Sequence, residues 1–120
     1  MAQQPTVLVV DDDPSIRKML NEVLSLEGIP VETAADGREA LDVLARSGPR
    51  VVLLDIGMPV MTGREVMQAL DANPTERSRH RIILMSAWTS LEQNADLEPD
   101  GKLAKPFTVD QLLNAISSNG

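Results

Sequence analysis

A run of apolar residues at 51–54 leads directly into Asp55, and a loop containing Gly57, Pro59 and Gly63 follows. An isolated carboxylate is costly to bury. We therefore expect Asp55 to lie at the open end of a buried strand, where a ligand or a reaction accounts for it. A strand that is apolar at every position is typical of a parallel sheet covered by helices on both faces.

The rest of the chain alternates between strand and helix patterns. Short apolar runs predict strands at residues 6–10, 29–34, 51–54, 81–85 and 102–104. Helical spacing predicts buried helix faces at Ile16, Met19, Leu20, Val23 and Leu24, at Ala40, Leu41, Leu44 and Ala45, at Val66, Met67 and Leu70, and at Val109, Leu112, Leu113 and Ile116. Predicted N-terminal caps stand at Asp13, Asp36, Thr62 and Thr108. The alternation indicates an α/β fold, a doubly wound five-stranded parallel sheet with right-handed crossovers.

Composition excludes several classes of protein. The chain has 120 residues, no cysteine and a formal charge of −7. Its length predicts a single domain, 1–120, in which 117–120 form a frayed tail or the start of a linker. The charge argues against direct nucleic-acid contact and is compatible with a cation. The absence of cysteine excludes disulfides and thiolate metal sites. With no signal peptide and no membrane-spanning stretch in the sequence, we expect a cytoplasmic location.

Polar side chains stand where the predicted strands end: Asp11 and Asp12 after the first, Asp55 after the third, Ser86 after the fourth and Lys105 after the fifth. In open parallel sheets, ligands bind at this edge. Clustered carboxylates repel one another unless a cation binds, and oxygen ligands open to water suit Mg²⁺. A carboxylate can attack phosphorus to give an acyl phosphate, while an ammonium and a hydroxyl hold phosphoryl oxygens.

Together these motifs resemble those of the receiver domain of two-component response regulators. The motifs are DD at 11–12, D-x-G-M-P at 55–59, S-A at 86–87 and K-P-F at 105–107. The resemblance covers nearly the whole chain and implies the flavodoxin-like (βα)₅ fold with strand order 2-1-3-4-5. It also implies a regulatory phosphoacceptor domain rather than a turnover enzyme, acting alone or with an output domain or target protein.

The resemblance implies a role for each site residue. Asp55 would accept a phosphoryl group from a phosphohistidine of a sensor histidine kinase or histidine phosphotransfer protein. Asp12 would bind Mg²⁺ directly, Asp11 would assist partly through water, and the Gly57 carbonyl oxygen would be a further ligand.

Two further side chains have roles by the same resemblance. Ser86 and Lys105 would bind phosphoryl oxygens, and Ser86 would move toward the phosphate as the switch. Pro106 resembles the cis-proline of the family.

The sequence also departs from the family. Lys102 stands where the family has its switch aromatic, and Phe107 is the only phenylalanine in a chain without tyrosine. The stretch between Ser86 and Lys105 is short and rich in residues that disfavour helices, so we expect a short fourth helix, with Leu91, Ala95 and Leu97 as its apolar anchors. Trp88 is interpreted either as a partly buried anchor of that helix or as a shield over the phosphoryl site.

Two other functions remain open. A pseudo-receiver would bind partners without phosphorylation. A haloacid-dehalogenase-type phosphatase would use a D-x-D motif, which residues 11–13 superficially offer, but that class needs acids after the lysine and only Asp110 follows Lys105.

Two groups of residues lie outside these motifs. A basic cluster of Arg77, Arg79, His80 and Arg81 is interpreted as a solvated loop or a docking patch. The methionines near the site, Met58, Met61 and Met67, are interpreted as gap-filling core and loop residues.

Overall fold

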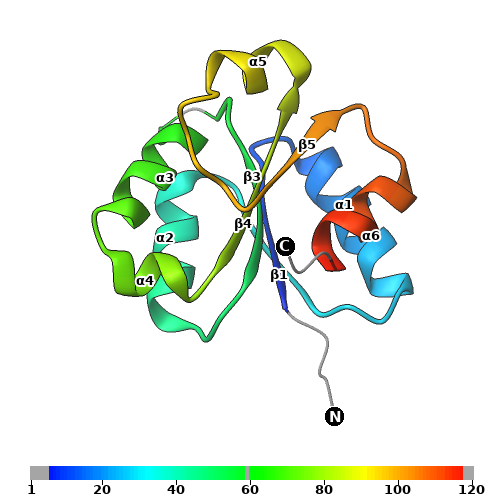
Figure 1. The fold of residues 1–120 in the computed structure, drawn as a ribbon. Helices are drawn as coiled ribbons and strands as arrows, with labels where there is room; N and C mark the ends of the chain where they lie inside the picture. The colour runs from blue at the N-terminus through cyan, green and yellow to red at the C-terminus, as the bar shows by residue number, and fades with distance from the viewer. Residues whose placement is uncertain (1–5, 59, 118–120) are drawn as a thin grey trace.

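Five parallel strands form one sheet in the computed structural model, which describes residues 6–58 and 60–117. The strands are β1 (Val7–Val10), β2 (Val31–Ala34), β3 (Val51–Asp55), β4 (Arg81–Ala87) and β5 (Gly101–Lys105). Their order is β2-β1-β3-β4-β5 (Figure 1). The predicted doubly wound sheet and the strand order implied by the resemblance are both confirmed. Of the predicted tail, residues 118–120 lie outside the described residues.

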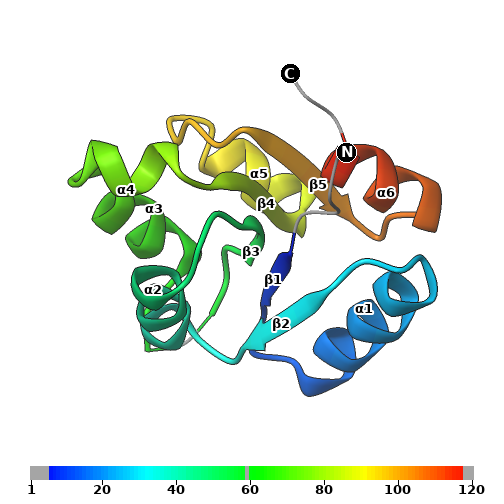
Figure 2. The same ribbon diagram turned by 90° about the horizontal axis from the view of Figure 1, so that it is seen from below.

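Helices cover both faces of this sheet (Figure 2). They are α1 (Pro14–Leu26), α2 (Gly37–Arg46), α3 (Gly63–Asp71), α4 (Pro74–Ser78), α5 (Trp88–Gln93) and α6 (Val109–Ser117). Buried side chains of α2, α3 and α5 share one core cluster with the sheet, whereas those of α1 and α6 share a second cluster on the other face. Two separate apolar layers, one on each face, are what a continuous apolar strand requires.

β3 is the centre of the sheet because it lies between β1 and β4, and all of its residues are buried. Val10 pairs with Leu54 in the β1–β3 register, and Asp55 pairs with Met85 in the β3–β4 register. The carboxyl ends of the three strands therefore finish at one edge of the sheet.

The predicted N-terminal caps are observed at Asp13, Asp36, Thr62 and Thr108. At α3, the Thr62 hydroxyl accepts from the Glu65 N–H while the Glu65 carboxylate accepts from the Thr62 N–H. Each cap satisfies N–H groups that have no partner inside the helix. Local sequence therefore sets where these helices begin.

Three residues predicted to face the core are exposed: Met19, Ala45 and Val109. Met19 and Ala45 lie at the edges of their apolar stripes, where a turn of 100° per residue directs the side chain toward the rim. Val109 is the first residue of α6 and lies before the turn that packs on the sheet. The other members of the predicted helix faces are buried or partly buried.

The basic cluster is not a solvated loop. Asn73 precedes helix α4, which the sequence did not predict, and caps it because its side chain accepts from the Glu76 N–H at 3.3 Å. His80 is only 4% exposed. Its Nδ1 accepts from the Arg50 N–H at 3.1 Å and its Nε2 lies 2.9 Å from a Glu76 carboxylate oxygen. These contacts across the fold make His80 a buried structural residue.

The predicted short helix is confirmed as α5, which has six residues. Leu91 and Leu97 are buried as expected, whereas Ala95 is exposed. Trp88 is 64% exposed, so its interpretation as a partly buried anchor is wrong. Of the two buried anchors, only Leu91 lies within α5, whereas Leu97 lies in the segment that follows the helix.

Candidate functional site

Asp55 is the last residue of β3 and is 7% exposed. One of its carboxylate oxygens, Oδ1, accepts from the Gly57 N–H at 3.4 Å and lies 3.8 Å from the Lys105 ammonium. The next helix is held close: a Cβ on Gly63 would collide with the Asp55 carbonyl oxygen. Glycine at this position lets the first turn of α3 lie directly on the end of β3.

Asp11 and Asp12 follow β1 at the same edge, and with Asp55 they form a cluster of three carboxylates. One oxygen from each residue lies within 4.8 Å of the other two. Asp11 and Asp55 are buried while Asp12 is exposed. The sequence predicted that these residues share one edge of the sheet, and the structure brings them into one site.

Lys105 is the only cation that forms an ion pair with these carboxylates in residues 6–58 and 60–117. Its Nζ lies 3.0 Å from Asp11 Oδ2 as well as 3.8 Å from Asp55 Oδ1. The bond from Lys105 to Pro106 is cis, in agreement with the resemblance. Lys105 is thus positioned between two of the three acids.

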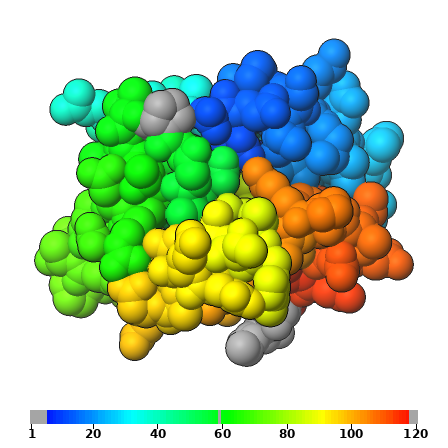
Figure 3. Space-filling model, turned by 90° about the horizontal axis from the view of Figure 1, so that it is seen from above, coloured from blue at the N-terminus to red at the C-terminus, as the bar shows by residue number. Residues whose placement is uncertain are grey.

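The register of the sheet places Ser86 near these residues. It is buried in β4, directly after Met85, which pairs with Asp55, and it pairs with Ala104 of β5. The structure therefore brings Ser86 to the same strand edge as the acids and the lysine. Figure 3 shows this face, where segments from β1–α1, β3–α3, β4–α5 and β5–α6 meet.

The environment raises the pKa of Asp55 above its ordinary value. Burial is the largest cause, and the charge of Asp11 adds to it, while Lys105 and the Gly57 N–H oppose the shift. A carboxylate whose charge is disfavoured by burial and by a like charge gains from a bound cation. The burial of Asp55 and the charge of Asp11 therefore favour the binding of a metal ion at this site.

The residues present fit Mg²⁺. Mg²⁺ takes oxygen ligands, retains several waters and is commonly held by one or two carboxylates. The three acids supply such oxygens, and Asp12 is open to water. At Gly57, an added Cβ would meet nothing within 4 Å, so this side of the site is open.

Two contributors to the site were not predicted from the sequence. Gly63 was predicted only as part of the loop that follows Asp55, although a glycine in the first turn of a helix is a signal of close approach. Arg17, on α1, donates from Nη1 to the Asp11 carbonyl oxygen at 2.7 Å. No local sequence pattern indicates that contact.

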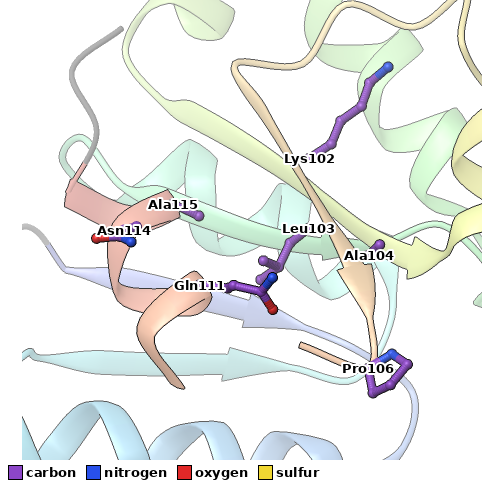
Figure 4. Close-up of a pocket in the computed structure, with 7 residues that line it drawn as sticks. All are labelled: Lys102, Leu103, Ala104, Pro106, Gln111, Asn114 and Ala115. Carbon is purple, nitrogen blue, oxygen red and sulfur yellow. The ribbon is translucent and has the colours of Figure 1, made fainter. Parts of the chain in front are cut away.

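A separate cleft of about 540 Å³ lies between β5 and α6 (Figure 4). It is lined by Lys102, Leu103, Ala104, Pro106, Gln111, Asn114 and Ala115. None of the acidic residues lines it. The cluster of three carboxylates therefore lies outside this cleft.

Comparison with known proteins agrees with this geometry. The family model described as the response regulator receiver domain matches residues 7–117. The chain therefore belongs to the response regulator receiver domain family. It is thus a regulatory phosphoacceptor domain of the kind that takes part in two-component signalling and phosphorelays.

Individual relatives support this membership. The chain is 37% identical over 116 residues to sporulation initiation phosphotransferase F of Bacillus subtilis, covering 92% of this chain and 89% of that protein. It is 39% identical over 110 residues to response regulator MprA of Mycolicibacterium vanbaalenii, covering 89% of this chain but 46% of MprA. The chain thus spans about half the length of the MprA relatives.

A solved structure also matches the fold. Response regulator TrrA of Thermotoga maritima, solved in complex with Mg²⁺ and BeF, is 33% identical with a TM-score of 0.80. The match covers 92% of this chain and 95% of TrrA.

Proposed function

We propose that Asp55 accepts a phosphoryl group from a phosphohistidine of a sensor histidine kinase or histidine phosphotransfer protein. An Asp55 carboxylate oxygen attacks phosphorus, the P–N bond of the phosphohistidine breaks, and the imidazole nitrogen takes up a proton. The product is an acyl phosphate on Asp55. The observation that carries this proposal is the buried Asp55 carboxylate with the two other acids and Lys105 gathered around it.

Mg²⁺ would be held by Asp11, Asp12, Asp55 and the backbone carbonyl of Gly57. When bound, it supplies positive charge that offsets the charge of the phosphoryl oxygens. Lys105, already 3.8 Å from Asp55, binds one of those oxygens after leaving Asp11.

The Ser86 hydroxyl donates a hydrogen bond to another phosphoryl oxygen. Its location at the end of β4 supports this role, because β4 leads directly into α5. Movement of Ser86 toward the phosphate would then displace the start of α5.

The partners and the limits of the domain are also proposals. We propose that residues 1–120 form one receiver domain that acts on an output domain or target protein in the cytoplasm. The family match over 7–117 supports one domain. In the described part of the chain, no helix has the length and apolar character needed to cross a membrane.

The phosphatase alternative has little support. Asp13, the second acid of its D-x-D motif, accepts from the Ser15 N–H at 2.8 Å as the cap of α1. It is not a member of the carboxylate cluster. Asp110, the acid after Lys105, lies in α6.

Incubation with a small phosphodonor and Mg²⁺, followed by intact-mass measurement, tests the proposal. We expect the mass of one added phosphoryl group on the wild type and none on Asp55→Asn. Asp13→Asn is the matched control, since it removes a neighbouring acid outside the cluster, and it should be phosphorylated. If no donor phosphorylates the wild type, the phosphoacceptor role is wrong and the pseudo-receiver alternative is favoured.

A further inference from the structure

We propose that Arg17 is a positioning residue for the metal site, because it fixes the peptide that joins Asp11 to Asp12. The inference rests on the proposed function, since it concerns the Mg²⁺ ligands named there. It adds a residue of α1 to a site otherwise built from strand ends.

Asp11 is held through all four of its polar atoms. Its N–H donates to the Ala34 carbonyl oxygen at 3.2 Å, and its Oδ1 accepts from the Asp13 N–H at 2.9 Å. Its Oδ2 accepts from Lys105 at 3.0 Å. The fourth atom, its carbonyl oxygen, accepts from Arg17 Nη1 at 2.7 Å. Arg17 thus completes the fixation of Asp11.

Asp12 depends on that fourth contact. The Asp11 carbonyl belongs to the planar peptide that ends at the Asp12 Cα, so fixing its oxygen fixes the plane from which the Asp12 side chain projects. The Asp12 carboxylate itself is exposed and accepts no hydrogen bond within the described residues. Its direction toward the cluster is therefore set through the backbone.

The start of α1 places the guanidinium of Arg17 over this peptide. Asp13 caps the helix, and the Arg17 N–H donates to the Asp13 carbonyl oxygen at 3.1 Å. Arg17 forms no salt bridge within residues 6–58 and 60–117, so its charge does not occupy a carboxylate of the cluster. Because its partner is a carbonyl, Arg17 adds no ion pair to the carboxylates of the cluster.

Mg²⁺ titration followed by backbone amide shifts of Asp12 and Gly57 tests the inference on the intact chain. Loss of a contact that orients a ligand commonly weakens metal binding by about 10–100-fold. We expect Arg17→Ala to raise the dissociation constant for Mg²⁺ about 10-fold, and Arg17→Lys, which keeps a donor and the charge, to give an intermediate value.

The matched control is Lys18→Ala, which removes the same charge from the next residue of α1. It should leave Mg²⁺ affinity within about 2-fold of wild type, since Lys18 is exposed and contacts no residue of the site within the described chain. Equal losses in Lys18→Ala and Arg17→Ala would assign the effect to charge and overturn positioning.

Wild-type affinity in Arg17→Ala would also overturn the inference while leaving the proposed function intact. A wild type without saturable shifts would instead overturn the metal site itself. If Arg17→Ala does not fold, Arg17→Lys and Lys18→Ala still decide, because positioning predicts a loss in the first and none in the second.

Discussion

Asp55 carries a charge that the surrounding fold disfavours in the absence of a cation. Burial and the charge of Asp11 raise its pKa, so the folded protein binds its proton more tightly than the unfolded chain. The favourable contribution of a protonated Asp55 is complete below the ordinary aspartate pKa of 3.8, which applies to the unfolded chain. It is lost as the pH rises through the higher folded pKa.

Asp55→Asn is therefore expected to stabilise the metal-free protein at pH 7, by about 1 kcal/mol, the order of one carboxylate–carboxylate repulsion in water-like surroundings. Urea unfolding of both proteins from pH 3 to pH 8 measures the effect. The difference should be small in acid and should grow as the pH rises. A variant that is less stable than wild type at pH 7 would show that Lys105 outweighs burial and Asp11.

Val60 has a strained backbone conformation, and burial of its side chain does not offset that strain. Its φ is 66°, in the left-handed region, and it is 79% exposed. That region costs an ordinary L-residue about 1–2 kcal/mol, and β-branched side chains are poorly suited to it. Asparagine adopts it more readily.

We expect Val60→Asn to raise the free energy of unfolding by about 1 kcal/mol, measured by urea denaturation. Val60→Ala is the control, because it removes apolar surface but keeps a Cβ that disfavours the left-handed region. A destabilised Val60→Asn would mean that the valine side chain makes a stabilising contribution in this loop.

At the scale of elements, apolar runs and caps were enough to predict every strand and most helix starts. The run at 51–54 could only be a covered strand, and Thr62 with Glu65 fixed the start of α3. The sequence predicted that Asp11 and Lys105 share one strand edge, but it did not reveal which distant side chains are in direct contact. Lys105 reaches Asp11 across 94 positions, and His80 reaches the Arg50 backbone across 30.

His80 joins α4 to the loop before β3. Because its Nδ1 accepts from the Arg50 N–H, we assign the proton to Nε2, which donates to Glu76. Hydrogen bonding to His80 is the largest cause of a lowered pKa of Glu76. The stabilising contribution of Glu76 is thus present above its unfolded pKa and is lost as the pH falls through the lower folded pKa.

His80→Ala should destabilise the protein by about 1–3 kcal/mol, because it leaves the Arg50 N–H without its acceptor. Urea unfolding measures the loss. His80→Gln, which retains an acceptor and a donor, should lose less. Phosphorylation of Asp55 should be preserved in both variants, since His80 makes no contact with the acidic site in the described chain. Wild-type stability in His80→Ala would contradict the structural role.

At the scale of the whole molecule, the acidic edge and the β5–α6 face have different chemistries. Lys102 extends from β5 away from α6 in Figure 4, where the family has an aromatic side chain. A rotating aromatic ring at this position is thus unavailable for transmitting the state of Asp55. The segment that follows α5 offers another connection. Asp96 pairs with Arg64 of α3, and Asp100 pairs with Arg77 of α4 at 3.0 Å.

That segment links the site to the β5 face through polar contacts. Arg64 follows Gly63, which lies against Asp55, and its guanidinium also donates to Asn94 at 3.1 Å. We therefore expect a change at Asp55 to reach residues 94–100 as well as α5.

A titration with Mg²⁺ and beryllofluoride, a phosphoryl mimic, followed by backbone amide shifts, tests the phosphoacceptor site most directly. For the wild type we predict saturable shifts at Gly57, Ser86 and Lys105, with further shifts across 91–105. Asp55→Asn should show none of the shifts that require beryllofluoride. Equal responses of wild type and Asp55→Asn, or no response in either, would contradict the assignment of Asp55 as the phosphoryl acceptor.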